Sequence, residues 1–245
     1  MIAKTFFLPL IAVILSFVGG FFIANALNKG EMDKLRKENE RLSKTVEENS
    51  KREAATTLSD EEIRAKIQRA DDSPGDLAFN RDLGMALYRY GAMRQDVDLI
   101  KESARLLERV NAADPKDYEV LVSLGNAEFD IANFAKENER FVKARSIYSK
   151  AIAIKQNDAV VRTDIALTYF LEQPPKITEA INEFDRALSI DPKNERALQY
   201  LIQSYWLKGD IGSAGKALER LKQVNTSNPA IPELNSLLTR TPPQQ

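Results

Sequence analysis

Apolar residues recur at intervals of three and four along much of the chain. Between residues 179 and 192, Ala180, Phe184 and Ala187 follow this spacing, which places them on one face of a helix. Proline disfavours helical geometry in the residue before it, so Asp191-Pro192 ends that helix. The same pattern recurs at Ala144, Tyr148 and Ala151, at Ala214, Leu218 and Leu221, and more weakly at Ser103, Leu107 and Val110. The chain is therefore predicted to be all-α, a solenoid of repeated helices that bury their apolar faces against neighbours.

Another helix, the first of each hairpin, precedes each of these and carries a leucine-glycine-like pair. The pairs are Leu83-Gly84, Leu124-Gly125, Ile165-Ala166 and Leu201-Ile202. A small second residue lets the two helices of a hairpin cross closely. Ile202 departs from this rule, so the last hairpin is expected to be more open or differently packed.

Set in register, these units resemble the tetratricopeptide repeat family. Leu124-Gly125-Asn126-Ala127 is the best match to the family's first helix, and Tyr169 and Tyr205 match its following aromatic position. The resemblance covers about residues 77–228 and implies a right-handed superhelical solenoid of about four hairpins. The predicted units are about 77–117, 118–158, 159–194 and 195–228, with a C-terminal capping helix at 230–239.

Both ends of the solenoid are predicted to be capped. Ser59 precedes Glu62 by three residues, which is a capping box that opens a helix over the first end. The turn residues 72–75 end this helix. The solenoid therefore spans 59–240, and residues 241–245 are expected to be a disordered tail.

The hairpins are predicted to differ in length. The distance from the second residue of each leucine-glycine-like pair to the alanine-like position of the next helix is 19, 19, 14 and 12 residues. It is counted from Gly84 to Ser103, Gly125 to Ala144, Ala166 to Ala180 and Ile202 to Ala214. The family's usual spacing is 12. Seven extra residues are close to two helical turns, which favours one added turn on each helix of the first two hairpins. The added segments, 93–100 and 134–141, are polar and are expected to face solvent, whereas Pro174-Pro175 predicts a non-helical turn in the third unit.

The N-terminal segment 1–28 contains an uncharged apolar run, Thr5–Leu27. A helix of that length spans about 35 Å, enough to cross a bilayer core of about 30 Å. It is predicted to be a transmembrane helix that anchors the chain in lipid. A cleaved signal peptide is the alternative, because Lys4 precedes the run and Ala24-Asn25-Ala26 is typical of a cleavage site.

A charged stalk with a hinge is predicted at residues 29–58. Met32, Leu35, Asn39, Leu42, Val46 and Asn49 follow the spacing of a coiled-coil seam. Asparagine at such a position favours a parallel dimer, and small residues every four positions in the anchor would let two anchors associate. The stalk therefore predicts a parallel homodimer, while a single charged spacer helix stays open as the alternative.

Composition narrows the chemistry. The 245 residues contain no cysteine and no histidine, and the formal net charge is −1. Thiol nucleophiles, disulfides and thiolate or imidazole metal sites are therefore excluded. No overall field favours nucleic acid. We expect no catalytic residue, metal or cofactor, since glycine-rich phosphate loops and nucleophile elbows are also lacking.

The resemblance implies that partners bind in a concave groove lined by the first helices. Arg81 and four rings in equivalent places, Tyr88, Phe129, Phe170 and Trp206, are the candidate groove residues. The alternative is that the rings are core packing. Some family members clamp a terminal carboxylate with basic residues and asparagines, at positions that correspond here to Arg81, Met85, Ser123, Val160 and Asp164. Only Arg81 fits, so this clamp is not expected.

The expected function is that of a membrane-anchored scaffold or assembly factor that binds a protein or peptide. A biogenesis chaperone that holds unfolded, apocytochrome-like clients is one alternative, and an enzyme with a carboxylate-based site is another of a different class. Localisation is predicted to be the cell membrane with a single pass. One basic side chain precedes the anchor and five follow it, which by a narrow margin favours a cytoplasmic solenoid over an exocytoplasmic or periplasmic one.

Overall fold

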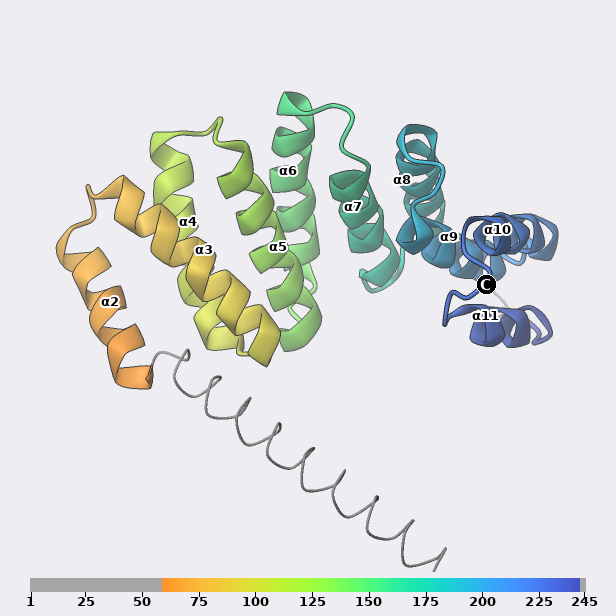
Figure 1. The fold of residues 1–245 in the computed structure, drawn as a ribbon, viewed down its shortest axis with the longest axis horizontal. Coiled ribbons are helices and arrows are strands. Elements are labelled where there is room, and N and C mark those ends of the chain that lie inside the picture. Colours follow the sequence, from red (N-terminus) through yellow and green to blue (C-terminus); the bar gives the residue numbers. More distant parts are fainter. Residues whose placement is uncertain (1–58, 243–245) are drawn as a thin grey trace, which may run out of the picture. The chain divides into compact units, whose positions relative to one another are not determined.

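A computed structural model describes residues 59–242, which contain ten helices and no strand (Figure 1). The chain divides into two compact units, residues 1–63 and 64–245, and the helical array described below belongs to the second. The helices are α2 (Asp60–Asp72), α3 (Leu77–Arg94), α4 (Val97–Ala113), α5 (Tyr118–Ala135), α6 (Glu139–Ile154), α7 (Ala159–Leu171), α8 (Ile177–Ile190), α9 (Glu195–Leu207), α10 (Ile211–Val224) and α11 (Ile231–Leu238). The prediction of an all-α array of successive hairpins is confirmed.

Several N-terminal predictions fall outside the described residues. These are the Thr5–Leu27 anchor, the coiled-coil stalk and the hinge up to residue 58. Among the helices of residues 59–242, none is long and apolar enough to cross a membrane.

Short acidic or amide side chains set where most helices begin. Asp76, Asp96, Asp158 and Asp210 each accept a hydrogen bond from the backbone N–H three residues on, and Asn194 does the same for α9. Such N-caps satisfy amide donors that the first turn leaves unpaired. The predicted capping box is confirmed, because the Ser59 N–H donates to Glu62 Oε2 at 2.8 Å and the Glu62 N–H donates to Ser59 Oγ at 3.2 Å.

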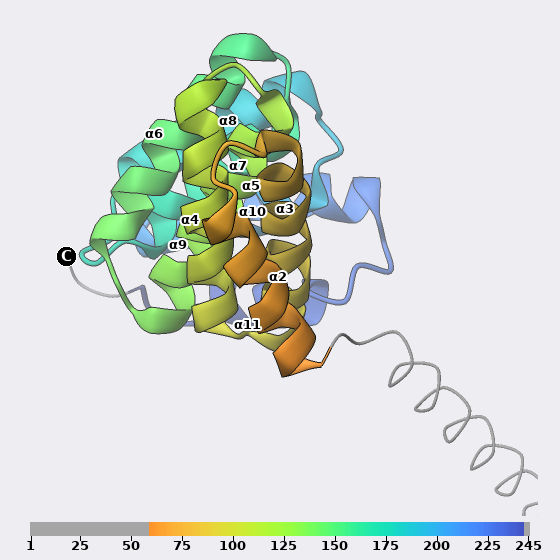
Figure 2. The same cartoon turned by 90° about the vertical axis from the view of Figure 1, so that its left-hand side faces the viewer.

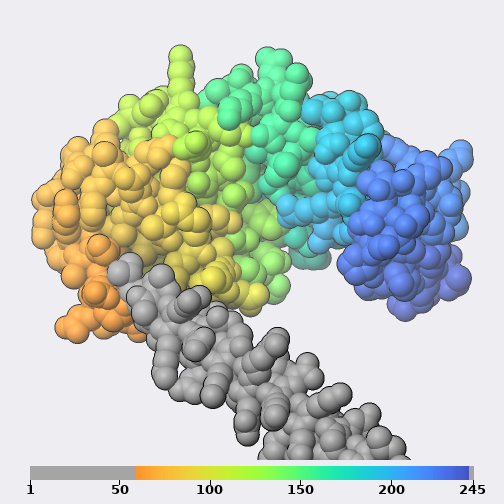
Figure 3. All heavy atoms as spheres, in the orientation of Figure 1, coloured from red at the N-terminus to blue at the C-terminus, as the bar shows by residue number. Residues whose placement is uncertain are grey.

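Within residues 64–242 the hairpins follow one another in a curved row (Figures 1 and 3). The two helices of each hairpin, α3 with α4 through α9 with α10, pack against one another. Successive first helices also meet directly, α3 with α5, α5 with α7 and α7 with α9. In a curved row the elements that approach most closely lie on the inside, so the first helices line the inner face. Helix α11 contacts both α9 and α10 and so covers the last hairpin.

The core forms two apolar clusters. One joins α4, α5, α6 and the start of α7, and the other joins α7 through α11. Phe129 and Tyr169 are partly buried against both clusters, so their rings connect the N-terminal and C-terminal halves of the array.

The small residues of the first helices lie where the hairpins cross. A Cβ atom on Gly125 would meet the Tyr148 ring at 2.6 Å, and one on Gly84 would meet Leu107 at 2.9 Å. The Ser103 hydroxyl donates to the Gly84 carbonyl at 2.7 Å across the same crossing. Ile202, at the equivalent place in the last hairpin, is fully buried in the same cluster as Ala214. The last hairpin therefore buries an isoleucine where the first two have a glycine.

The predicted length differences are confirmed. Helices α3 and α4 have 18 and 17 residues and α5 and α6 have 18 and 16, whereas α7 and α8 have 13 and 14. The Pro174-Pro175 segment is non-helical, as predicted. The expectation that the added segments face solvent is wrong at their ends: Ile100 is 0% exposed and Phe141 4%. Longer helices need more apolar residues to cover them, and these two supply that contact.

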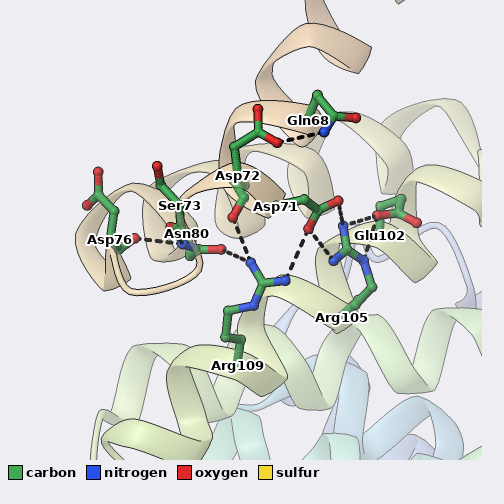
Figure 4. Close-up of polar contacts among 10 residues, drawn as sticks. Gln68, Asp71, Asp72, Ser73, Asp76, Asn80, Glu102, Arg105 and Arg109 are labelled. Carbon is green, nitrogen blue, oxygen red and sulfur yellow. Dashed lines mark hydrogen bonds and ion pairs between the residues drawn. The ribbon is translucent and has the colours of Figure 1, made fainter.

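The first end of the array, which faces the viewer in Figure 2, is fastened by charge pairing between side chains (Figure 4). Asp71 near the end of α2 accepts from Arg105 at 2.6 Å and from Arg109 at 3.1 Å, both on α4. Arg109 also donates to the Ala70 carbonyl at 2.9 Å and to Asn80 on α3 at 2.7 Å. These contacts tie the end of α2 to the first hairpin, and they lower the pKa of Asp71 through the two guanidinium groups.

The close crossing at Gly125 can be tested with two alanine substitutions in a fragment of residues 59–245. Gly125→Ala should reduce the free energy of unfolding by about 1–3 kcal/mol, because the buried Tyr148 ring leaves no room for a methyl group. Gly215→Ala in α10 is the control, since a Cβ there meets nothing within 4 Å. It should raise stability by about 0.5–1 kcal/mol through helix propensity. Urea denaturation measures both, and a change of the same sign in both variants would contradict the crossing argument.

Candidate functional site

The inner face carries a hollow of about 270 Å³ near the middle of the array. It is lined mainly by first helices, with Tyr88 from α3, Asn126, Phe129 and Asp130 from α5, Val160 and Asp164 from α7, and Arg196 from α9, and Tyr148 of α6 forms its base. Residues from four successive hairpins therefore meet at one place. Val160 is 62% exposed, so the hollow has an apolar rim open to solvent.

Asp164 is the most strongly perturbed acid of the hollow. Arg196 donates to its Oδ1 at 2.7 Å, yet only 13% of the Asp164 side chain is exposed. Burial disfavours the charged form and raises the pKa of Asp164 to about 6, with the nearby Arg196 opposing the rise. Asp164 is thus a carboxylate near its titration point at neutral pH.

Asp130 also lines the hollow and accepts a hydrogen bond from a tyrosine. The Tyr88 hydroxyl donates to Asp130 Oδ2 at 3.0 Å. Burial raises the pKa of Asp130 and also that of Tyr88, which the neighbouring carboxylate raises further. At the base, the Tyr148 hydroxyl donates to Asn126 Oδ1 at 2.7 Å, which fixes the amide. The arrangement offers carboxylate acceptors beside aromatic rings.

Of the predicted groove residues, the structure brings Tyr88 and Phe129 together in the hollow and places the others elsewhere. Arg81 donates to Asp117 at 2.8 Å and to Glu119 at 2.5 Å, so its guanidinium joins α3 to the start of α5. Both acids raise the pKa of Arg81. A side chain so engaged is poorly placed to hold a partner's carboxylate.

Phe170 and Trp206 make contacts within the chain. The Phe170 ring meets that of Tyr200 edge to face at a centroid distance of 5.3 Å and packs on the C-terminal cluster. The indole N–H of Trp206 donates to the Arg240 carbonyl at 3.3 Å. A groove role for these two rings stays a prediction.

Three polar or charged residues of the hollow were not among the predicted groove residues: Asn126, Asp130 and Arg196. The sequence comparison places Asp164 and Val160 only at positions of a carboxylate clamp. A signal exists for these residues, because each is a first-helix residue close to a leucine-glycine-like pair. The sequence does not show which of several first-helix charges share one hollow, since that depends on the crossing angles of four hairpins. Within residues 59–242 no group of three or more histidines, cysteines or carboxylates is placed to hold a metal ion.

Comparison with known proteins agrees with this architecture. Residues 176–238 match the family model of the tetratricopeptide repeat. The matched residues run from the start of α8 to the end of α11, so the family signature covers the C-terminal part of the array. No protein with a curated description matches the sequence.

Several solved repeat structures share the fold. A crystal structure of MamA has a TM-score of 0.54 at 21% identity, over 67% of this chain and 87% of that one. The RS-1 MamA ArsTM double mutant has a TM-score of 0.57 at 16% identity, over 76% and 96%. A thermophilic tetratricopeptide repeat protein of Thermus thermophilus has a TM-score of 0.54 at 14% identity, over 82% and 97%. At these identities the likeness shows the fold alone.

The raised pKa of Asp164 predicts how stability depends on pH. The folded state binds a proton more tightly than the unfolded state, whose aspartate has its ordinary pKa of 3.8. Below pH 3.8 the carboxyl is protonated in both states, and the free energy of unfolding falls as the pH rises from 3.8 to about 6, because only the unfolded state ionises readily in that range. Across that window the wild-type fragment 59–245 should lose about 2–3 kcal/mol relative to Asp164→Asn, which cannot titrate.

Urea denaturation of both fragments at closely spaced pH values measures this difference. Subtracting the variant removes the shared contributions of the other carboxyl groups, including the raised pKa of Asp130. Two stability curves that run parallel between pH 4 and 7 would show that the Asp164 carboxyl titrates at its ordinary value.

Proposed function

We propose that this chain is a membrane-anchored scaffold or assembly factor that binds a peptide or a helix of a partner protein on the inner face of its solenoid. It acts by binding rather than by catalysis. The tetratricopeptide repeat fold supports protein partners in general. The hollow on the first helices carries the more specific proposal, because it gathers residues of four hairpins beside an exposed apolar side chain, Val160.

The composition of the hollow suits a peptide. Val160 and Phe129 supply apolar contact, and Asp130, Asp164 and Arg196 supply groups that orient a polar chain. Its volume of about 270 Å³ is below the roughly 300–1,000 Å³ of pockets that enclose a small molecule. A site of this size takes one side chain of a longer ligand, and the rest of the ligand extends along the inner face.

The anchor and its orientation belong to the same proposal. Thr5–Leu27 holds the chain in the cell membrane as a single span, the stalk pairs two chains in parallel, and the right-handed solenoid lies on the cytoplasmic side. Support comes from the length of the apolar run, from the coiled-coil spacing of residues 32–49 and from the basic residues that follow the anchor. All of these residues lie outside the described part of the chain.

Peptide binding can be tested with a matched pair of substitutions. Peptides are first selected from a displayed random library on the full chain in detergent micelles. Val160→Gln, on the inner face, should then weaken their binding by about 2 kcal/mol, because it removes the apolar contact without adding charge at a residue central to the interface. Val142→Gln is the control, because Val142 is also exposed, at 51%, but lies on the second helix α6. Its affinity should stay within about twofold of the wild type, as for a residue outside the interface.

The outcomes of this selection separate the candidate functions. Peptides that share a sequence pattern indicate a scaffold, whereas unrelated apolar peptides indicate the chaperone alternative. Failure to select any peptide, or a loss of binding in Val142→Gln alone, would contradict binding on the inner face.

Membrane attachment can be tested by fractionation of cells that make the full chain. The chain should stay with the membranes through an alkaline wash and be released only by detergent, because an apolar helix of this length partitions into lipid. A chain that starts at residue 28 should be washed off. Protease added to intact spheroplasts should spare the solenoid if it is cytoplasmic, and digestion would place it on the other side. Release of the full chain by the alkaline wash would contradict the anchor.

A further inference from the structure

We propose that the inner-face hollow binds a lysine or arginine side chain of the partner. This rests on the proposed function, because it assumes that a peptide lies on the inner face. It adds a chemical requirement that the fold alone does not contain: the partner must offer a cation at the centre of its contact.

The charges of the hollow would be balanced by one added cation. Asp130 and Asp164 supply two carboxylates and Arg196 supplies one guanidinium, so the lining carries a net charge of about −1 when both acids are ionised. Each carboxylate uses one oxygen within the chain, Asp130 for the Tyr88 hydroxyl and Asp164 for Arg196. Among the described residues no hydrogen bond engages the second oxygen of either. A bound ammonium or guanidinium group would satisfy these acceptors.

The perturbed titration of the two acids agrees with this assignment. Burial raises the pKa of both Asp130 and Asp164, which means that neither carboxylate is fully compensated in the free protein. An opposite charge within about 4–6 Å favours the ionised form. A cation from the partner would supply that charge.

The walls of the hollow fit the aliphatic part of a basic side chain. Lysine and arginine lay their methylene groups along apolar surface while the charged end meets polar groups. Val160 and Phe129 offer such surface at the rim and the wall. Aromatic rings attract cations, and Tyr88 and Phe129 are among the lining residues.

An acidic partner group is disfavoured by the same lining. Arg196 is the one cationic residue in it, and this residue is already paired with Asp164 at 2.7 Å. A carboxylate that approached Arg196 would also approach Asp164 and Asp130. Like charges at such distances repel, so the hollow selects against acidic residues.

The test uses the displayed random peptide library on the full chain in detergent micelles. Selection on the wild type should enrich lysine or arginine at one position of the recovered peptides. The most enriched peptide should bind Asp130→Asn about tenfold more weakly, because a charge-assisted hydrogen bond is lost. Asp98→Asn is the matched control, with the same change at an exposed position of the second helix α4. It should bind as the wild type does.

A second variant guards against a folding defect in Asp130→Asn. Arg196→Gln removes the positive charge of the hollow, so it should bind the basic peptide at least as tightly as the wild type. A site that recognises carboxylates would instead lose affinity in this variant. Circular dichroism of each variant verifies that the helices are intact.

Failure of this inference is distinguishable from failure of the proposed function. If no peptide is selected, the inner face does not bind peptides and the proposed function fails. If peptides are selected and Val160→Gln weakens their binding, but acidic or uncharged residues dominate or Asp130→Asn binds normally, only the basic side chain is refuted.

Discussion

The close crossing within the first two hairpins is the constraint on which the rest of the array depends. Gly125 lies against the Tyr148 ring with no space for a methyl group, and Gly84 lies against Leu107 in the same way. Each hairpin buries its apolar face only against its neighbours, so the stability of the array is a sum of hairpin and interface contributions. Close crossing keeps the second helices packed behind the first, and the first helices then meet one another along the inside of the curve. Without this arrangement, residues from α3, α5, α7 and α9 would not share one hollow.

The inner face also holds partly buried carboxylates. Asp164 and Asp130 are held in partly dehydrated surroundings with one strong partner each, although carboxylates favour full hydration. Glu128, on the same helix as Asp130, shows the contrast: it is fully buried, but Arg140 and Lys143 each approach one of its oxygens at 2.8 Å. Glu128 is compensated within the chain and serves packing inside its hairpin. Asp130 and Asp164 are compensated only in part, and the proposal that a partner's cation completes them rests on this difference.

Much of the fold could be predicted from the sequence because helix pairs are local. The spacing from Gly125 to Ala144 indicates a longer hairpin than the spacing from Ile202 to Ala214, and the helix lengths agree. The site was harder to predict, because it forms between residues far apart in sequence. Tyr88 of the first hairpin donates a hydrogen bond to Asp130 of the second, and Arg196 of the fourth hairpin donates one to Asp164 of the third. Phe170 has the same position in its repeat as Tyr88, but its ring packs against Tyr200 and is not part of the hollow. Position in the repeat therefore does not decide whether a ring lines the hollow.

Two arginines of the first helices show how this array differs from repeats that clamp a carboxylate. Arg81 corresponds to a basic clamp position, but Asp117 and Glu119 occupy its donors. Asp164 corresponds to another clamp position and carries the opposite charge, and it holds the guanidinium of Arg196. The free acceptors of the hollow are therefore anionic, and its one guanidinium is engaged within the chain. Specificity depends on repulsion as well as attraction. Repeats with a carboxylate clamp bind acidic chain ends, whereas the hollow proposed here would exclude them and admit a basic side chain.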